Sequence, residues 1–383
     1  MMELDQLRQE IDAVDKRLVE DIKERMKVAA AIAAYKREHG IPVMDSKRER
    51  EVLHKIVEMA GDPMLSSYYK VLYSLLFELS RSYQNKLIGN NEEAFKDIRA
   101  AIENTPKMFP KMAGVACQGV EGAYSMIACE KLFNSPNIMY LGNFEGVFSA
   151  VENGLCEYGI LPIENSTAGS VRKVYDLMLS HNFYIVRSTR IKVNHCLIAK
   201  QGTELKDVKE IYSHEQAISQ CSEFLKELGS GVKVTEVENT AVAAQMVAQS
   251  GRNDVAALSS YRCAELYGLK SIKSNVQDNG NNHTRFICIS KKPEIYPGAN
   301  KTSVMMVLSH RPGALYKMLA RFYALDINVV KLESRPMPDR DFEFMFYFDI
   351  ETSVYSEEFV QMISELSDGT EEFHYLGSYS EVM

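Results

Sequence analysis

The first helical segment of the chain carries a cation within its apolar stripe. Residues 4–35 contain neither glycine nor proline, and apolar side chains recur there at intervals of three and four, which predicts one long helix with a buried stripe. The stripe comprises Leu4, Leu7, Ile11, Val14, Leu18, Val28 and Ile32. Arg25 occupies a position of the same stripe. Because an unpaired buried guanidinium is costly, this position predicts an ion pair, such as one with Asp21, or a pocket for an anionic ligand.

Two further helices are predicted after the first. Gly40 and Pro42 end the first helix, and a second can be capped by Asp45 or Ser46. A third helix spans about residues 63–87, with proline at its start. The first 88 residues are therefore expected to form a small all-helical unit.

Polar residues of this unit share faces of the predicted helices. Lys36 follows Arg25 by eleven residues, about three turns, so the two cations lie on nearly the same face. Ser80 and Gln84 are four residues apart and share one face of the third helix. A charge in an apolar stripe can also do no more than fix helix register and partner number, and this structural alternative stays open.

The polar residues of the helical unit form a recognisable set. They are Arg8, Arg25, Lys36, Asp45, Arg48, Glu49, Ser80 and Gln84. In this order and at these spacings the set resembles the all-helical chorismate mutases, whose three-helix chains intertwine as dimers. The resemblance covers about residues 1–88. It implies a site that holds one conformer of chorismate and stabilises negative charge on the breaking ether oxygen, with no nucleophile and no proton transfer.

The same resemblance assigns a role to each position. Arg25 and Arg48, with the partner subunit's Arg8, would bind the two carboxylates of chorismate. Lys36 and Gln84 would contact the ether oxygen. The ring hydroxyl would bind to the remaining acidic pair, supported by one hydroxyl side chain: Asp45, Glu49 and Ser80.

Composition limits the remaining possibilities. The chain has 383 residues, of which 46% are hydrophobic, which suits several domains with proper cores. A net charge of −8, without a basic stripe, argues against nucleic-acid binding. The charged start and the absence of a long apolar run argue against a leader or membrane span, so we expect a cytoplasmic protein. The seven cysteines lack CxxC spacing and are expected to be reduced and buried, with neither metal nor cofactor implied.

Two composition breaks divide the rest of the chain. Residues 89–110 are polar and end in prolines, as is typical of a linker, and a second break falls at residues 291–301. Domains are therefore expected at 1–88, 111–291 and 300–383. In the middle domain short apolar runs alternate with helical patterns, which predicts an α/β fold.

Three loops of the middle domain place polar residues next to predicted strands. The glycine-rich turn at 119–125 can present amides to an anion, but it can equally be a plain connection. Residues 162–170, PIENSTAGS, lie at a strand end, where open α/β sheets bind ligands. Ser166, Thr167 or Ser170 there can alternatively cap a helix. Further polar residues follow in YSHEQAISQC and QDNGNNHTRF, although a lone histidine or threonine in a loop is usually structural.

GILPIENSTAGSV, YSHEQAISQC and QDNGNNHTRF together resemble the signatures of prephenate dehydratases, over about residues 112–290. The resemblance implies two α/β lobes like those of a periplasmic binding protein, with a cleft between them. Thr284 would donate a hydrogen bond to the departing hydroxyl. The residues expected to bind substrate or support the cleft are Asn165, Ser166, Thr167, His214, Gln220, Arg285 and Phe286. Two positions depart from the family pattern, Glu215 in place of proline and Ala123 in place of serine.

The last eighty residues predict a separate α+β domain in the order strand, helix, two strands, helix, strand, as in ferredoxin-like folds. Pro312 at a helix start leaves later amides free for a carboxylate. Alternating phenylalanines are expected to be core rather than a ligand site: Phe342, Phe344, Phe346 and Phe348.

GALY and ESRP in this domain resemble the regulatory ACT domains of prephenate dehydratases, which bind L-phenylalanine at a subunit interface. The implied effector-binding residues are Gly313, Ala314, Leu315, Glu333, Ser334 and Arg335. Feedback inhibition by phenylalanine is the expected consequence.

The three resemblances together match the bifunctional chorismate mutase/prephenate dehydratases. The expected protein is a homodimer or homotetramer that acts on chorismate and prephenate and binds neither nucleic acid nor membrane. Two alternatives remain: a dehydratase whose helices only dimerise the chain, and a non-catalytic amino-acid sensor. A filled set of mutase residues argues against both, because a mere dimeriser does not need Arg25 and Lys36 on one face.

Overall fold

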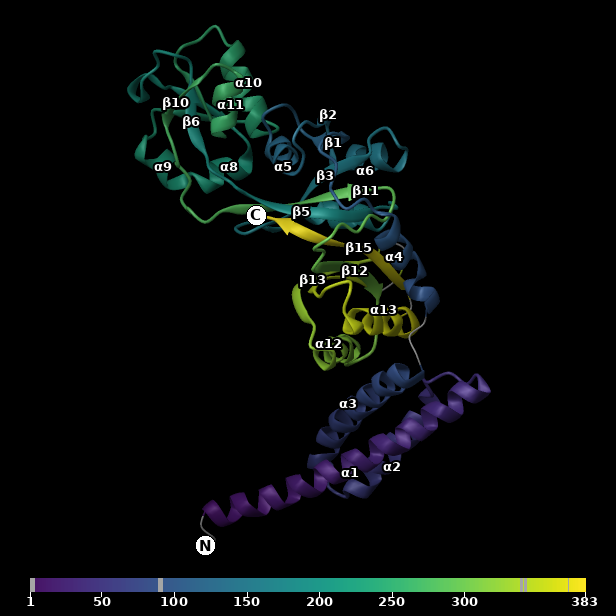
Figure 1. The fold of residues 1–383 in the computed structure, drawn as a ribbon. Helices are drawn as coiled ribbons and strands as arrows, with labels where there is room; N and C mark the ends of the chain where they lie inside the picture. The colour runs from purple at the N-terminus through teal and green to yellow at the C-terminus, as the bar shows by residue number, and fades with distance from the viewer. Residues whose placement is uncertain (1–3, 89–91, 338–339, 341–342, 371) are drawn as a thin grey trace. The chain divides into compact units, whose positions relative to one another are not determined.

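The computed structural model describes residues 4–88, 92–337, 340, 343–370 and 372–383 (Figure 1). It divides into two compact units, and we describe each separately. The first contains residues 1–99 and 305–374, and the second contains residues 100–304 and 375–383.

The first unit begins with the three expected helices, α1 (Leu4–His39), α2 (Ser46–Ala60) and α3 (Pro63–Ile88). Of the two candidate caps for α2, Asp45 is the one used, because its carboxylate accepts the Arg48 N–H at 2.9 Å. Gly61 ends α2 in the left-handed conformation, which a glycine adopts without strain. Both α1 and α2 pack against α3.

The apolar stripe of α1 is exposed in the single chain, which contradicts the expected burial. Its seven residues retain 42–63% of their accessible surface, whereas the buried residues of α1 are Ala29 and Ala33. The physical reason is length. The N-terminal half of α1, with the stripe residues from Leu4 to Leu18, extends past the ends of α2 and α3, which cannot cover it (Figure 1). Val28 and Ile32 lie in the other half and are exposed as well, so length does not account for these two.

The predicted linker contains a helix, α4 (Glu92–Asn104). Phe95 on its apolar side is buried and packs edge-on against the ring of Phe359, with centroids 6.1 Å apart. Residues 89–91 of the linker lie outside the described residues.

The C-terminal elements follow the order expected from the sequence. They are β12 (Lys301–Val307), α12 (Ala314–Ala324), β13 (Asn328–Pro336), β14 (Phe344–Glu351), α13 (Glu357–Gly369) and β15 (Glu372–Val382). Within the first unit, β13 pairs with β14 in antiparallel register. The expectation that the phenylalanine stripe is core holds for Phe348 but not for Phe344 and Phe346, which line a cavity. Phe342 lies outside the described residues.

The second unit has two lobes, each built on one sheet. The first sheet has the order β15-β5-β11-β3-β1-β2. Its strands are β1 (Gly114–Gln118), β2 (Asn137–Leu141), β3 (Tyr158–Asn165), β5 (Tyr184–Lys192), β11 (His283–Ser290) and the end of β15; the short β4 (Gly169–Ser170) pairs with β3. Its helices are α5 (Tyr124–Leu132), α6 (Phe144–Glu152) and α7 (Arg172–Met178).

The second lobe has the strand order β10-β6-β9-β7-β8. The strands are β6 (Cys196–Ala199), β7 (Glu210–Ser213), β8 (Lys233–Glu236), β9 (Val255–Ser259) and β10 (Lys270–Lys273). The helices are η1 (Leu205–Asp207), α8 (Glu215–Gln220), α9 (Ser222–Glu227), α10 (Thr240–Gln249) and α11 (Tyr261–Leu266).

Two segments, residues 193–195 and 274–282, join the lobes. They bond to one another, because the His195 carbonyl accepts the Val276 N–H at 3.0 Å and the Asn282 carbonyl accepts the Val193 N–H at 2.8 Å. The chain therefore passes between the lobes through a hydrogen-bonded pair of segments.

The end of the chain completes the first sheet of this unit. Ser380, Glu381 and Val382 of β15 lie parallel to residues 187–189 of β5. Gly377 makes this approach possible, since its φ is +132° and a Cβ there would lie 2.2 Å from the Ile185 carbonyl oxygen.

All seven cysteines are buried and unpaired, as expected. Within the described residues, none of the helices combines the length and apolar character needed to cross a membrane.

Candidate active sites

Arg25 contacts helix α3. Its Nη1 donates to the Leu76 carbonyl at 3.4 Å, and its guanidinium lies 6.0 Å from the centroid of the Phe77 ring. Among the described residues the ion pair with Asp21 is not found. Arg25 therefore faces α3 without a carboxylate partner there, as the anionic-ligand alternative requires.

Ser80 and Gln84 lie next to each other on α3, as expected from their spacing, and both are buried. The Gln84 amide nitrogen donates to the Ser80 carbonyl at 3.2 Å. Its Oε1 is buried and has no hydrogen-bond partner within the described residues. A buried acceptor of this kind needs a donor from a ligand, water or another chain.

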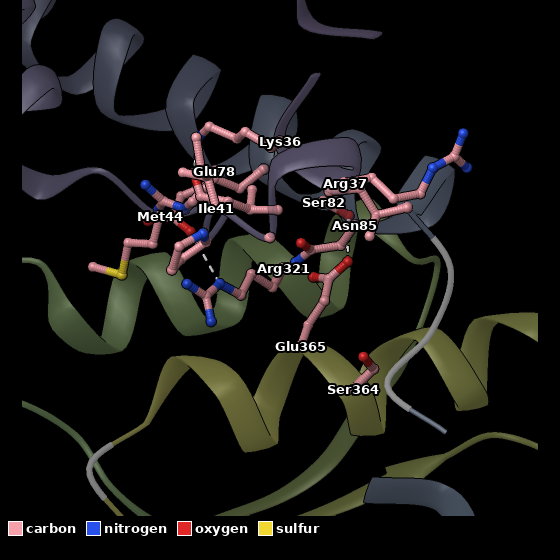
Figure 2. Close-up of a pocket in the computed structure, with 15 residues that line it drawn as sticks. Lys36, Arg37, Ile41, Met44, Glu78, Ser82, Asn85, Arg321, Ser364 and Glu365 are labelled. Carbon is pink, nitrogen blue, oxygen red and sulfur yellow. Dashed lines mark hydrogen bonds and ion pairs between the residues drawn. The ribbon is translucent and has the colours of Figure 1, made fainter. Parts of the chain in front are cut away.

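An ionic chain that the sequence analysis missed runs beside these residues. Arg81 forms ion pairs with both Glu49 and Glu78. The other oxygen of Glu78 accepts the Arg321 Nε–H at 2.9 Å (Figure 2). Burial alone would raise the pKa of Glu78, but Arg321 and Arg81 lower it below the ordinary value. Glu78 and Arg81 are three residues apart on α3, a pairing signal available in the sequence; the partner on α12 was not predictable from spacing.

A cavity of about 610 Å³ lies at this chain of charges. The loop from Gly40 to Met44 forms one wall, with Lys36, Glu78, Arg321 and Glu365 around it (Figure 2). The Lys36 ammonium donates to the Val43 carbonyl, so it faces this loop.

The remaining mutase candidates are more exposed. Arg8 pairs with Asp5 at 3.0 Å and Arg48 lies 3.6 Å from Glu51, both at the surface. One chain therefore brings Arg25, Ser80 and Gln84 to a common helix interface but leaves Arg8 and Arg48 outside it.

In the second unit the residues from two separate motifs meet. Thr284 on β11 is paired in register with Asn165 on β3, and the Asn165 amide nitrogen donates to Thr284 Oγ1 at 2.9 Å. Ser166 clamps the same strands, since its hydroxyl donates to the Asn281 carbonyl at 3.0 Å and accepts the His283 N–H at 2.9 Å. The N-cap residue of α7 is Val171, which makes no side-chain cap, so none of Ser166, Thr167 and Ser170 is the N-cap residue of this helix.

Gln220 joins this group through residues that the sequence analysis did not select. Its Oε1 accepts the Asn282 amide N–H at 2.9 Å and lies 3.1 Å from His195 Nε2. Asn282 also accepts from Asn165 at 2.7 Å. Asn282 is part of the motif QDNGNNHTRF, a signal that could have identified it. His195 lies outside the three motifs.

The other predicted site residues of this unit bond to another strand, pack in the core, cap a helix or lie exposed. Arg285 points away from Thr284, as alternation along a strand requires, and its Nη2 donates to the Tyr379 hydroxyl at 2.9 Å. Phe286 is buried in the hydrophobic core of the first lobe. His214 caps α8 by accepting the Gln216 N–H at 3.2 Å, and Glu215 beside it is exposed. Thr167 is exposed, and only its backbone N–H reaches Asn165.

The glycine-rich turn at 119–125 is a packing feature. A Cβ on Gly122 would lie 2.8 Å from the Cys263 sulfur, so only glycine fits between the turn and α11. Ala123 precedes α5 and makes no side-chain cap. The plain-connection alternative accounts for this turn.

A second cavity lies at the start of α12. Gly313, with φ +84°, opens the helix, and a cavity of about 290 Å³ there is lined by Gly313, Ala314, Leu315, Phe344 and Phe346 among others. Every residue of β13, which carries Glu333, Ser334 and Arg335, keeps solvent exposure in the single chain.

Comparison with known proteins identifies two family matches. Residues 7–85 match the model of chorismate mutase type II, and residues 115–294 match that of prephenate dehydratase. A bifunctional chorismate mutase/prephenate dehydratase of Enterobacter agglomerans is 32% identical over 97% of this chain and 95% of its own. An arogenate dehydratase/prephenate dehydratase 2 of Arabidopsis thaliana is 38% identical over 69% of this chain and 72% of its own.

Solved structures extend the comparison to the fold. A prephenate dehydratase from Arthrobacter aurescens in complex with L-Phe has 25% identity and a TM-score of 0.64, covering 70% of this chain and 90% of its own.

Proposed function

This chain belongs to the bifunctional chorismate mutase/prephenate dehydratases, and we propose that its two active sites are formed by the α1–α3 residues and by the Asn165–Thr284 group described above. The observation that carries the proposal is the 2.9 Å hydrogen bond between Asn165 and Thr284, which joins two motifs 119 residues apart in the chain.

The mutase site has to act without covalent chemistry. Chorismate carries two carboxylates and rearranges by a concerted shift of electrons, so cations that fix its conformer and stabilise the ether oxygen supply the catalysis. Arg25 and Lys36 provide such cations. The ether oxygen can only accept a hydrogen bond, so Gln84 would contact it through its Nε2–H group, which here donates to the Ser80 carbonyl.

The dehydratase site has to let two groups leave prephenate. The bond to the ring carboxylate breaks and releases carbon dioxide, its electron pair enters the ring, and the ring hydroxyl departs and takes up a proton to give water. Aromatisation drives the step. A threonine hydroxyl is a very weak acid, so Thr284 acts as a hydrogen-bond donor to the departing oxygen rather than as the proton source.

Assembly follows from the exposed stripe of α1. A 36-residue helix with an apolar face needs a covering surface, and a second copy of α1 supplies one of matching length. In such a dimer the partner's Arg8 would complete the mutase site. Leu18→Asp should therefore weaken self-association in analytical ultracentrifugation and abolish rearrangement, whereas Arg8→Ala should abolish rearrangement alone.

Phenylalanine regulation is proposed for the α12 cavity. The Ala314 N–H donates to the Arg311 carbonyl at 3.1 Å, so an α-carboxylate would bind to the amides that follow it at the start of α12. Phe344 and Phe346 can contact an aromatic ring. The exposed β13 offers the surface for a subunit interface. Gly313→Val should weaken phenylalanine binding measured by calorimetry and relieve inhibition; unchanged inhibition would place the effector elsewhere.

One experiment tests the two activities together. Purified protein is supplied with chorismate alone, and prephenate and phenylpyruvate are measured for the wild type, Arg25→Ala and Thr284→Val. We expect the first variant to lose rearrangement only and the second to lose dehydration only. Arogenate supplied in parallel separates the two substrates named for the plant relative. Equal loss of both activities in both variants would contradict two independent sites, and absence of rearrangement in the wild type would favour the dehydratase-only alternative.

A further inference from the structure

A chain of hydrogen bonds with a fixed direction leads to Thr284. It starts at two backbone amides, since the N–H groups of Thr167 and Ala168 donate to Asn165 Oδ1 at 3.0 and 2.8 Å. A backbone N–H can only donate, so the oxygen of the Asn165 amide is identified without ambiguity. The nitrogen of that amide must therefore face the opposite side.

The orientation of the Asn165 amide determines its hydrogen bonds to two neighbouring side chains. Its Nδ2 has two hydrogens, one directed at Thr284 Oγ1 at 2.9 Å and one at Asn282 Oδ1 at 2.7 Å. Because Asn282 presents its oxygen to Asn165, its nitrogen is the atom that donates to Gln220 Oε1 at 2.9 Å. The orientation of three amides is thus set in sequence.

The chain ends at a buried histidine. Gln220 Oε1 is also 3.1 Å from His195 Nε2, and an oxygen can only accept, so Nε2 carries the hydrogen. His195 is 3% exposed, and its Nδ1 is buried without a partner among the described residues, as the unprotonated nitrogen of this tautomer can be. Burial also lowers the pKa of His195, which favours the neutral ring.

This direction decides what Thr284 can do. Its oxygen already accepts from Asn165, and the described residues offer its hydroxyl hydrogen no other bond. The hydrogen is therefore available to an acceptor on a bound substrate. A reversed Asn165 amide would instead take up this hydrogen, and Thr284 could then no longer donate to a substrate.

The network also spans the two lobes. Gln220 belongs to α8 of the second lobe, and Asn165 and Thr284 belong to the first. His195 and Asn282 lie on the two segments that join the lobes, where they are buried. These two residues hold amides from both lobes in one orientation.

We propose that His195 and Asn282 are positioning residues of the dehydratase, which fix the Gln220 and Asn165 amides and so keep the Thr284 hydroxyl directed as a donor toward the departing hydroxyl of the substrate. The proposal rests on the role of Thr284 proposed above. It assigns no proton transfer to His195.

The first test uses paired substitutions at His195 in the full-length protein. His195→Phe keeps a ring but loses the donor, whereas His195→Gln places an amide N–H near the position of Nε2. We expect His195→Phe to lower the dehydratase kcat about tenfold with a smaller change in KM, and His195→Gln to recover most of it. Rearrangement of chorismate should be unchanged in both and serves as the control for folding.

The second test reads the tautomer directly. Long-range proton–nitrogen spectra of the eight histidines, with His195 assigned by its loss in His195→Gln, should show hydrogen on Nε2. In Asn282→Asp the carboxylate requires Gln220 to turn its nitrogen toward it, so His195 should shift its hydrogen to Nδ1.

Several results would overturn the proposal. They are a hydrogen on Nδ1 in the wild type, a His195→Phe enzyme with full dehydratase kcat, and a His195→Gln enzyme as slow as His195→Phe. A separate outcome tests the underlying function: if Thr284→Val keeps its dehydratase activity, the role of Thr284 is wrong whatever His195 does. In a Thr284→Val background His195→Phe should cause no further loss, because the donor that it positions is already absent.

Discussion

Replacing Glu78 with glutamine removes the carboxylate that two arginines share. Glu78 is only 4% exposed and holds Arg81 through one oxygen and Arg321 through the other. Breaking a buried ion pair by removing one partner costs about 3–5 kcal/mol. Arg81 keeps Glu49, so we expect the lower end, about 3 kcal/mol, for Glu78→Gln. Arg321→Met leaves Glu78 paired with Arg81 and should cost about 1–2 kcal/mol.

Hydrogen exchange is the suitable assay because the chain has several domains and its unfolding need not be two-state. A loss of about 3 kcal/mol corresponds to a roughly hundredfold fall in the protection of α3 and α12 amides. Peptides from β9 in the second unit provide an internal control. Glu20→Gln, which breaks an exposed pair with Lys23, is the matched control and should change protection by less than tenfold.

The pH dependence of the stability tests the same prediction in a second way. The pKa of Glu78 is lowered in the folded protein, so its contribution is present above the ordinary value of 4.5 and is lost as the pH falls through the folded value. The difference between the wild type and Glu78→Gln should therefore shrink below about pH 4.5. Equal protection of both proteins at pH 7 would refute the reasoning that these charges stabilise the contact between α3 and α12.

Three further predictions concern single sites. Gly377→Ala should lower the free energy of unfolding by about 2–4 kcal/mol, because of its positive φ and the clash with Ile185. Gly298→Ala, which has open space at φ +87°, should lower it by about 1 kcal/mol. Thermal melts compare the two variants. Hydrogen bonds from Lys233, Arg252 and Thr235 lower the pKa of Glu210 to about 2, so the stabilisation lost in Glu210→Gln should be full above pH 4.5 and vanish near pH 2 in denaturant titrations. Asp45→Asn should keep the α2 cap, and Asp45→Ala should lose about 1 kcal/mol of helix stability by circular dichroism.

The sequence predicted well what depends on local pattern. The three N-terminal helices and the cap at Asp45 follow from periodicity and helix-end signals, which act within a few residues. The meeting of Asn165 and Thr284 was expected from motifs and not from periodicity. Phe286 shows the limit of prediction from motifs, because it belongs to a motif but is a core residue.

What the sequence did not reveal depends on distant pairing. Arg321 lies 243 residues from Glu78, and His195 lies 25 residues from Gln220 in another element. No local periodicity encodes such contacts, because the tertiary fold brings the partners together. The expected burial of the α1 stripe was wrong for a related reason. The pattern shows that a face is apolar but not which molecule covers it.

The closing strand of the chain has a consequence for how such genes can be rearranged. β15 begins beyond α13 and ends beside β5, where Tyr379 accepts a hydrogen bond from Arg285 and Val382 from Thr189. Recombination at a single junction near Lys291 would therefore deliver a dehydratase lacking an edge of its own sheet. Evolutionary exchange of the last domain has to bring along these final residues, or else rebuild that edge from another source.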